Sequence, residues 1–289
     1  LEQVEVLRGP QSVLFGKNTL AGAVNIRSAS PEVGGETSGR IAASVESNDG
    51  QIFEGWFQTS LGDSLAVRLA ARDRSDEGYL DNAFTSVDPT VLPSAPQSDE
   101  QIFRISARWE PSESTQVDLK YLRSEHERLG ATSVITLFQP TANLPALDTA
   151  GYALNGALYP NAPLGEYYRS AYSIGGAALS GRQSDIGGPG ERPEGTETEN
   201  DEWSLNIKHD LNDTMSISWT SGYSEYYFED GLDADWGPLR FIGRSDDQEF
   251  DQQSHEFRLS SASDNLFWTV GVNYLESTQE INRLTVLDG

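Results

Sequence analysis

The sequence predicts an all-β protein, an antiparallel transmembrane β-barrel of which this chain forms a part, and three observations favour that class. Many stretches alternate apolar and polar residues with a period of two, which gives a strand one apolar and one polar face. Short connections rich in Gly, Pro, Asn, Asp and Ser alternate with long ones, as in outer-membrane barrels with short periplasmic turns and long extracellular loops. Strands of about ten residues, at ~3.3 Å each and a ~45° tilt, span roughly 23 Å, close to the ~25 Å apolar band of such barrels.

Composition excludes several classes of protein. The 289 residues include 45 acidic and 20 basic ones, for a formal charge of −25, so electrostatic binding of nucleic acid is excluded. There is no cysteine, which removes disulfides, thiolate nucleophiles and cysteine-ligated metals. No apolar run approaches the ~18–20 residues of a transmembrane helix. The chain begins with Leu1, and Met215 is its one methionine, so we expect it to be a piece of a longer protein.

The first thirty residues do not follow the strand alternation. A short strand around Glu5 leads into a turn, a second apolar element ends at a glycine, and small residues precede a second strand-like stretch. Small residues there indicate close backbone approach. These features are, in order, Val4–Val6, Arg8-Gly9-Pro10, Leu14-Phe15-Gly16, Ala21-Gly22-Ala23 and Val24-Asn25-Ile26.

The remaining chain predicts a linker over 31–38 and about nine strands from residue 39 to residue 289. In the third strand, for example, Leu65, Val67 and Leu69 share one face. The strands are expected near 39–48, 51–61, 64–77, 99–109, 114–127, 199–209, 214–228, 250–261 and 266–280. The long connections are expected near 78–98, 128–198 and 229–249.

An odd number of strands indicates that the barrel is incomplete in this chain, because bacterial single-chain barrels have even numbers. The alternative fold is a soluble all-β sandwich with one dry face. A sandwich rarely accommodates a connection as long as 128–198, which favours the barrel.

The N-terminal motifs resemble the C-terminal end of the plug domain of TonB-dependent outer-membrane receptors. That family's pattern is approximately E-V-L-R-G-P, then L-[YF]-G, then G-x-[IV]-N-[IV]. Here the three parts are Glu5 to Pro10, Leu14 to Gly16, and Gly22 to Ile26. The family often has two glycines where this chain has Ala21-Gly22, which is a mild departure. The resemblance implies the end of a plug over 1–30, followed by about nine strands of a barrel of about 22.

The resemblance implies structural or gating roles for the plug motif rather than chemistry. Arg8 could pair with an inward-facing carboxylate of the barrel wall, for which Glu46, Glu54 and Asp118 are candidates. The motif residues are Glu5, Arg8, Gly9, Pro10, Leu14, Phe15, Gly16, Gly22 and Asn25.

A search for catalytic and metal-binding motifs indicates no enzyme, no catalytic or metal-ligating residue, and no cofactor. The three histidines have no metal-ligand spacing, and no G-x-S-x-G nucleophile elbow occurs. The segment from Glu225 to Asp251 is strongly acidic. Its negative field is expected to oppose an anionic iron chelate.

Aromatic residues fall into two groups. Those in the long connections could contact a ligand, because Tyr and Trp give large contact area at low entropic cost, although packing within the loops is the alternative. These are Tyr79, Tyr152, Tyr167, Tyr168 and Trp236. Others lie on the apolar side of strands and are expected to be membrane-interface anchors. These are Trp109, Trp203, Trp268 and Tyr274.

The function implied by the resemblance is active, TonB-dependent uptake of a scarce solute across the outer membrane of a Gram-negative bacterium. A ferric siderophore is the leading substrate, and cobalamin, haem or an oligosaccharide are alternatives. A passive porin or a surface adhesin would be alternatives of another class. The expected partners are TonB, through a TonB box outside this chain, outer-membrane lipid and lipopolysaccharide, and a small ligand such as a ferric chelate. The full-length receptor is expected to be a monomer.

Overall fold

The computed structural model describes residues 2–10, 20–81, 93–130, 195–233 and 242–287. These residues form strands and turns. None of the described segments is a helix long and apolar enough to cross a membrane.

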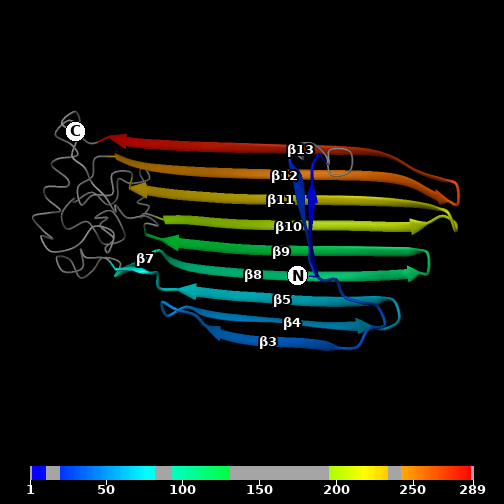
Figure 1. The fold of residues 1–289 in the computed structure, drawn as a ribbon, viewed down its shortest axis with the longest axis horizontal. Coiled ribbons are helices and arrows are strands. Elements are labelled where there is room, and N and C mark those ends of the chain that lie inside the picture. The colour runs from blue at the N-terminus through cyan, green and yellow to red at the C-terminus, as the bar shows by residue number, and fades with distance from the viewer. Residues whose placement is uncertain (1, 11–19, 82–92, 131–194, 234–241, 288–289) are drawn as a thin grey trace, which may run out of the picture.

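The dominant element is one antiparallel sheet of nine strands in which every neighbour is also the next sheet strand along the chain (Figure 1). This up-and-down order follows from the short connections, since a tight turn can only join adjacent antiparallel strands. The nine strands are β3 (Ser38–Val45), β4 (Gln51–Leu61), β5 (Leu65–Asp76), β8 (Gln97–Ser112), β9 (Thr115–Leu129), β10 (Gly195–Asp210), β11 (Met215–Asp233), β12 (Ile242–Ser263) and β13 (Leu266–Leu287).

Two small ribbons accompany the sheet. β1 (Gln3–Arg8) pairs antiparallel with β2 (Gly22–Arg27), and we call this pair the N-terminal hairpin. It crosses in front of the sheet in Figure 1, with its strands running across the sheet strands. The second ribbon, β6 (Leu80–Asp81) with β7 (Ser94–Ala95), extends the connection between β5 and β8.

The sheet has two faces of different chemistry. We call the face that carries Leu65, Val67 and Leu69 the apolar face, and the opposite one the hairpin face. The register places Leu69 beside Phe57 and Ile105, so apolar side chains continue from strand to strand across the apolar face. Almost nothing covers this face: of the described apolar residues, only Pro31, Ala66 and Ala95 are buried, none of them on this face, while many large ones are exposed. Exposed apolar bands of this kind mark contact with lipid or another partner.

The two ends of the sheet also differ. We call the end where tight turns join β4 to β5, β8 to β9, β10 to β11 and β12 to β13 the turn end, and the opposite one the loop end. Figure 1 shows the turn end on the right and the N-terminal hairpin in front of the middle of the sheet. The strands lengthen from 8 residues in β3 to 22 in β12 and β13, and the register places the extra length at both ends of the sheet.

The nine expected strands are all present, but the later ones are longer than expected at the loop end. β10 begins at Gly195 rather than near 199, and β13 continues to Leu287 rather than ending near 280. β11 and β12 together occupy most of the connection expected near 229–249. In the added segments of β10, β11 and β12, side chains on both faces are mostly polar. The alternation that identifies a strand in the sequence is therefore absent there.

Candidate functional site

The N-terminal hairpin is closed by a side-chain pair from the sequence motif. Glu5 and Asn25 stand opposite each other in the β1–β2 register. The Asn25 amide donates a hydrogen bond of 2.8 Å to one Glu5 oxygen, and Gln3 donates one of 2.9 Å to the other. Both carboxylate oxygens are therefore bonded within the hairpin. This supports a structural role for Glu5 and Asn25.

Gly22 allows the two hairpin strands to approach each other. Its φ is +140°, and a Cβ at this position would lie 2.3 Å from the Leu7 carbonyl oxygen. No side chain fits there, so glycine is required by contact as well as by conformation. Gly9 also has a positive φ, of +83°, but a Cβ there would meet nothing within 4 Å. Pro10 is exposed, and Leu14, Phe15 and Gly16 lie outside the described residues.

Replacing Asn25 with alanine is expected to destabilise the hairpin by about 1 kcal/mol, because it removes one part-buried hydrogen bond. Amide hydrogen exchange of residues 2–10 and 20–27 in the intact receptor would measure this as faster exchange. Gln3→Ala is the matched control, since Gln3 bonds the same carboxylate at an exposed site. Equal exchange rates in the two variants would contradict the role given to Asn25.

The segment after the hairpin contacts the sheet. The Lys120 ammonium on β9 lies 3.3 Å from the Ser28 hydroxyl, to which it donates a hydrogen bond. Ala29 lines a cavity whose other lining residues belong to β3, β4, β5 and β8. These contacts fix which face of the sheet the N-terminal hairpin lies against.

The hairpin face carries ion pairs with partly buried members. Arg108 donates two hydrogen bonds, of 2.7 and 3.2 Å, to the two oxygens of Asp118 on the next strand. Arg74 pairs with Glu46 at 3.2 Å. Glu46 and Asp118 were both candidate partners for Arg8, and each already has an arginine of the sheet as partner. The pairing of Arg8 with one of these carboxylates stays a prediction.

Removing the Asp118 charge is expected to lower stability by about 1–3 kcal/mol, because Arg108 would keep its charge in a partly buried position without its bidentate partner. Asp118→Asn can be compared with Arg108→Gln and with the double variant in a thermodynamic cycle, measured by urea-driven unfolding in lipid vesicles. A coupling energy near zero would contradict this pairing. Asp63→Asn, in the exposed turn between β4 and β5, serves as the control for loss of a carboxylate.

A second ion-pair group lies on the hairpin face at the loop end. Arg283 donates hydrogen bonds of 2.5 and 3.2 Å to the two oxygens of Asp246, which is 2% exposed. Arg244 lies 3.2 Å from both Asp230 and Asp246. Hydrogen bonding to Asp246 raises the pKa of the Arg283 guanidinium, so it stays charged at any physiological pH. The two acidic side chains on the hairpin face here, Asp230 and Asp246, are thus neutralised by arginines.

The other acidic residues of this part of the chain that the structure describes are on the opposite face. In the β11–β12 register Glu225 stands opposite Asp251, and Tyr227 stands opposite Glu249, all on the side of the apolar face. Because side chains alternate between the faces with a period of two, the described acids divide between the two faces, and the two on the hairpin face, Asp230 and Asp246, are paired with arginines. That the negative field of residues 225–251 opposes an incoming anion stays a prediction.

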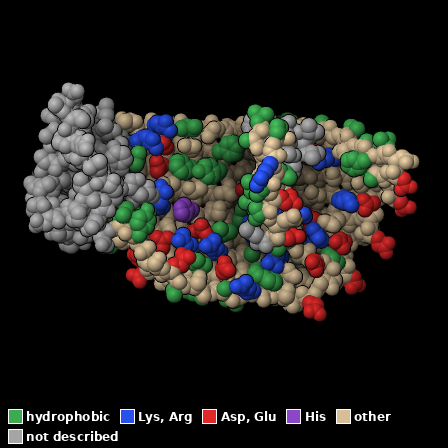
Figure 2. All heavy atoms as spheres, viewed as in Figure 1, with side chains coloured by type: hydrophobic (Ala, Val, Ile, Leu, Met, Phe, Trp, Pro, Cys, Tyr) green, Lys and Arg blue, Asp and Glu red, His purple; other side chains and the backbone are tan. Residues whose placement is uncertain are grey.

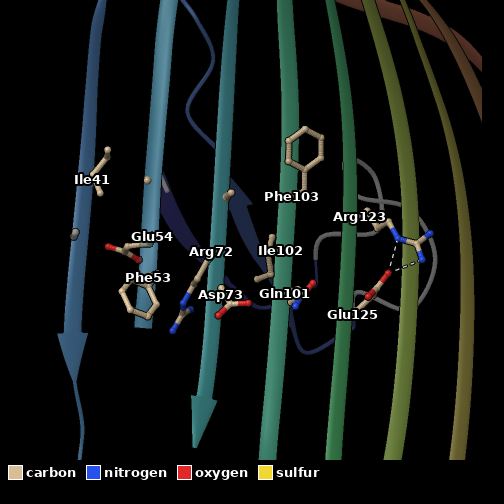
Figure 3. A pocket seen from close by; sticks show the side chains of 13 residues that line it. Ile41, Phe53, Glu54, Arg72, Asp73, Gln101, Ile102, Phe103, Arg123 and Glu125 are labelled. Atoms are coloured by element: carbon tan, nitrogen blue, oxygen red, sulfur yellow. Dashed lines mark hydrogen bonds and ion pairs between the residues drawn. The ribbon is translucent and has the colours of Figure 1, made fainter. Parts of the chain in front are cut away.

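The acidic residues on the apolar face lie nearer the loop end than a row of aromatic residues. Tyr121 and Trp203 pack with ring centroids 4.4 Å apart. Two residues nearer the loop end on the same strands, Arg123 forms ion pairs with Glu199 at 3.1 Å and Asp201 at 2.8 Å. Figure 3 shows Arg123 directed towards Glu125, to which it donates a hydrogen bond of 2.7 Å. An apolar band thus changes to a charged border at an aromatic row, as at a membrane–water interface.

The apolar face has a cavity where two small residues are neighbours on adjacent strands. Gly55 and Ala71 lie side by side in the register, between Ile41 and Phe103. A cavity of about 490 Å³ forms there, and residues of β3, β4, β5, β8 and β9 line it (Figure 3). Its walls on the apolar face are hydrocarbon at Ile41, Phe53 and Phe103, and they are polar towards the loop end, at Asp73, Gln101, Arg123 and Glu125. A lipid chain fits such a surface in chemistry, so the hollow needs no soluble ligand.

The hairpin face has a cavity of different chemistry. It measures about 720 Å³, and Arg40, Arg68, Arg72 and Arg104 line it together with Ala29. Glu54 is the one acidic residue among the described residues that line it. Figure 2, viewed onto the hairpin face, shows Lys and Arg side chains interspersed with Asp and Glu over the sheet beside the hairpin. Sequence reasoning missed this cavity, although arginines at positions of the same parity on neighbouring strands would have indicated it.

The predicted ligand-contact and anchor residues are only partly described. Tyr79 is 61% exposed, and its backbone N–H donates to the Ala95 carbonyl oxygen; Tyr152, Tyr167, Tyr168 and Trp236 lie outside the described residues. The register places the four anchor residues on the apolar face, Trp109 and Trp268 near the turn end and Trp203 and Tyr274 towards the loop end. Their contact with a membrane interface stays a prediction. Among the residues that the structure describes, no cluster of three or more His, Cys, Asp or Glu could hold a metal ion.

Comparison with solved structures decides the fold. The ferric yersiniabactin uptake receptor FyuA from Yersinia pestis superposes with a TM-score of 0.66 at 16% identity, over 98% of this chain and 37% of that receptor. The ferripyoverdine receptor of the outer membrane of Pseudomonas aeruginosa gives a TM-score of 0.63 at 12% identity, over 99% of this chain and 33% of the receptor. The fold is that of the TonB-dependent receptors. In outer-membrane barrels the polar face of the sheet lines the lumen and the apolar face meets lipid.

Sequence comparison agrees with the TonB-dependent receptor fold over a shorter stretch. The ferrioxamine B receptor of Salmonella typhimurium is 28% identical over 130 residues, which is 44% of this chain and 16% of that receptor. No family model matches the sequence. The chain therefore spans well under half of the proteins that it resembles. These TonB-dependent receptors are transport receptors rather than enzymes.

Proposed function

We propose that this chain is part of a TonB-dependent receptor that imports a ferric siderophore across the outer membrane. The observation that carries the proposal is the N-terminal hairpin against the polar face of a sheet whose other face is apolar. A barrel whose lumen contains a folded element cannot be an open pore. Transport through it requires that the element move, and TonB supplies that movement from the proton gradient of the inner membrane.

In this proposal residues 1–30 form the end of the plug, 31–38 the linker, and 39–289 the first part of the barrel. The hydrogen bonds of Glu5 with Asn25 and the close contact at Gly22 support the role of the motif in holding the plug together. TonB would bind a TonB box elsewhere in the protein, and lipid and lipopolysaccharide would surround the apolar face. A full-length monomer suits a closed barrel, which leaves no strand edge free.

Iron is the proposed cargo because the proteins of similar fold and sequence carry the printed names of ferric yersiniabactin, ferripyoverdine and ferrioxamine B receptors. The arginine-lined cavity on the hairpin face supports an anionic chelate. The loop residues Tyr79, Tyr152, Tyr167, Tyr168 and Trp236 remain the proposed ligand contacts at the outer mouth.

The abundance of the receptor with and without iron tests the cargo. Outer-membrane fractions of the source bacterium are compared after growth with and without an iron chelator, by quantitative mass spectrometry. An increase of tenfold or more on chelation is expected for an iron importer. An unchanged amount would contradict iron as the cargo and favour cobalamin or an oligosaccharide, which the same assay tests by changing the vitamin or the carbon source.

A further inference from the structure

The arginine-lined cavity on the hairpin face contains more positive charge than the described residues neutralise. Arg72 lies 3.4 Å from Glu100, its acidic partner, and its Nε is buried without a hydrogen-bond partner among the described residues. Arg40 and Arg104 form no ion pair with any residue that the structure describes, and neither does Glu54. Four guanidinium groups thus share a cavity with one carboxylate on its wall.

Two of these arginines stand at the ends of a row of side chains whose middle is uncharged. Arg40, Trp56, Ala70 and Arg104 form one register row across β3, β4, β5 and β8. With strands ~4.8 Å apart, the backbones at the two ends of the row are about 14 Å from each other. The small side chain of Ala70 leaves the middle of the row open. The side chains of Arg40 and Arg104 can therefore both reach a ligand that lies over Ala70 on the hairpin face.

Arg68 is held in place by neutral neighbours. It donates a hydrogen bond of 2.7 Å to the Gln58 side chain, and its guanidinium lies 4.0 Å from the centre of the Trp56 ring. Neither contact neutralises the charge, but both fix the plane of the guanidinium, and stacking leaves N–H donors free at its edge. A pre-positioned guanidinium loses little entropy when an oxyanion binds.

We propose that this cavity binds a small polycarboxylate. Planar guanidinium groups form bidentate hydrogen bonds with carboxylates, and arginine is the residue that suits this recognition best. The volume of about 720 Å³ is in the range of ligand pockets, roughly 300–1,000 Å³. A single carboxylate from a protein side chain would neutralise one arginine, whereas a di- or tricarboxylate matches the excess. As a step in transport the site rests on the proposed function, because a carboxylate-bearing chelate would stop there in the lumen.

Calorimetric titration of the intact purified receptor with propane-1,2,3-tricarboxylate at low salt tests the site. Wild type is expected to bind the tricarboxylate at least tenfold more tightly than acetate. The variant Arg40→Gln/Arg104→Gln is expected to lose at least tenfold in affinity. Arg258→Gln is the matched control: Arg258 is on the same face, on β12, pairs with Glu256, and lies outside the cavity. Its affinity is expected to equal that of wild type.

Two results would overturn the site. They are no binding of the tricarboxylate by wild type, and equal binding by the double variant. If wild type does not bind and the double variant also has a lowered melting temperature, the arginines pair with a carboxylate of the protein. If the double variant does not assemble, the single variants Arg40→Gln and Arg104→Gln are titrated, each with an expected loss of at least threefold. Because binding is measured without iron, it separates failure of this site from failure of iron uptake.

Discussion

Gly22→Val is expected to unfold the N-terminal hairpin in the intact receptor. A Cβ at this position would lie 2.3 Å from the Leu7 carbonyl oxygen, and φ of +140° is not accessible to a β-branched residue. The combined cost is expected to be at least about 3 kcal/mol, more than a hairpin of two six-residue strands can offset. Hydrogen-exchange mass spectrometry would show loss of protection over residues 2–10 and 20–27.

Gly9→Ala is the matched control for this experiment. Gly9 also has a positive φ, but no atom lies within 4 Å of the added Cβ. Only the conformational cost of about 1 kcal/mol applies, so protection should fall slightly. If Gly22→Val kept the wild-type protection, the close approach of β1 and β2 at this residue would be refuted.

Val270→Arg is expected to destabilise the folded receptor in lipid by about 2–4 kcal/mol, while Thr269→Arg should cost less than about 1 kcal/mol. Val270 is on the apolar face and 64% exposed, between the aromatic residues Trp268 and Tyr274 of the same strand. Thr269 is directed to the opposite face, where its hydroxyl lies 3.0 Å from the Ser260 hydroxyl. Val270 is thus expected to meet hydrocarbon, while its neighbour Thr269 meets water.

Urea-driven unfolding of the intact receptor in phospholipid vesicles measures both variants. The difference between the two, rather than either value, tests the assignment of faces, because both add the same side chain at neighbouring positions. Similar losses for both variants would mean that the strand is not lipid-facing on one side, and would favour the soluble sandwich.

The fold was predictable from sequence where one face of a strand contacts apolar surroundings. β4 has the bounds expected from its alternation, Gln51 to Leu61. The loop-end extension of β10 was not predictable, because residues such as Glu197 and Thr198 are polar on both faces. Pairing with an adjacent strand, rather than the hydrophobic pattern, keeps that segment extended.

The candidate site was predictable only in part. The close approach of the backbone at Gly22 was expected from the small residues of the N-terminal motif. The bond between Glu5 and Asn25 was not predicted, because it depends on the pairing of β1 with β2. The arginine-lined cavity depends on the register between β3 and β8, which sequence alternation does not give, since any shift by two residues preserves the faces. The division of the charges of residues 225–251 between the two faces was not predictable either, because the net charge of a segment does not give it.

Uptake of iron-55 as ferrioxamine B tests the central claim most directly, with a panel of other ferric siderophores measured in parallel. The source bacterium is compared with a strain in which the intact gene is deleted and with that strain carrying the wild-type gene or Gly22→Val. The account predicts that deletion abolishes uptake of one siderophore, that wild type restores it and Gly22→Val does not, and that a protonophore stops it. Unchanged uptake of every siderophore after deletion would contradict the claim that this chain belongs to a ferric siderophore importer.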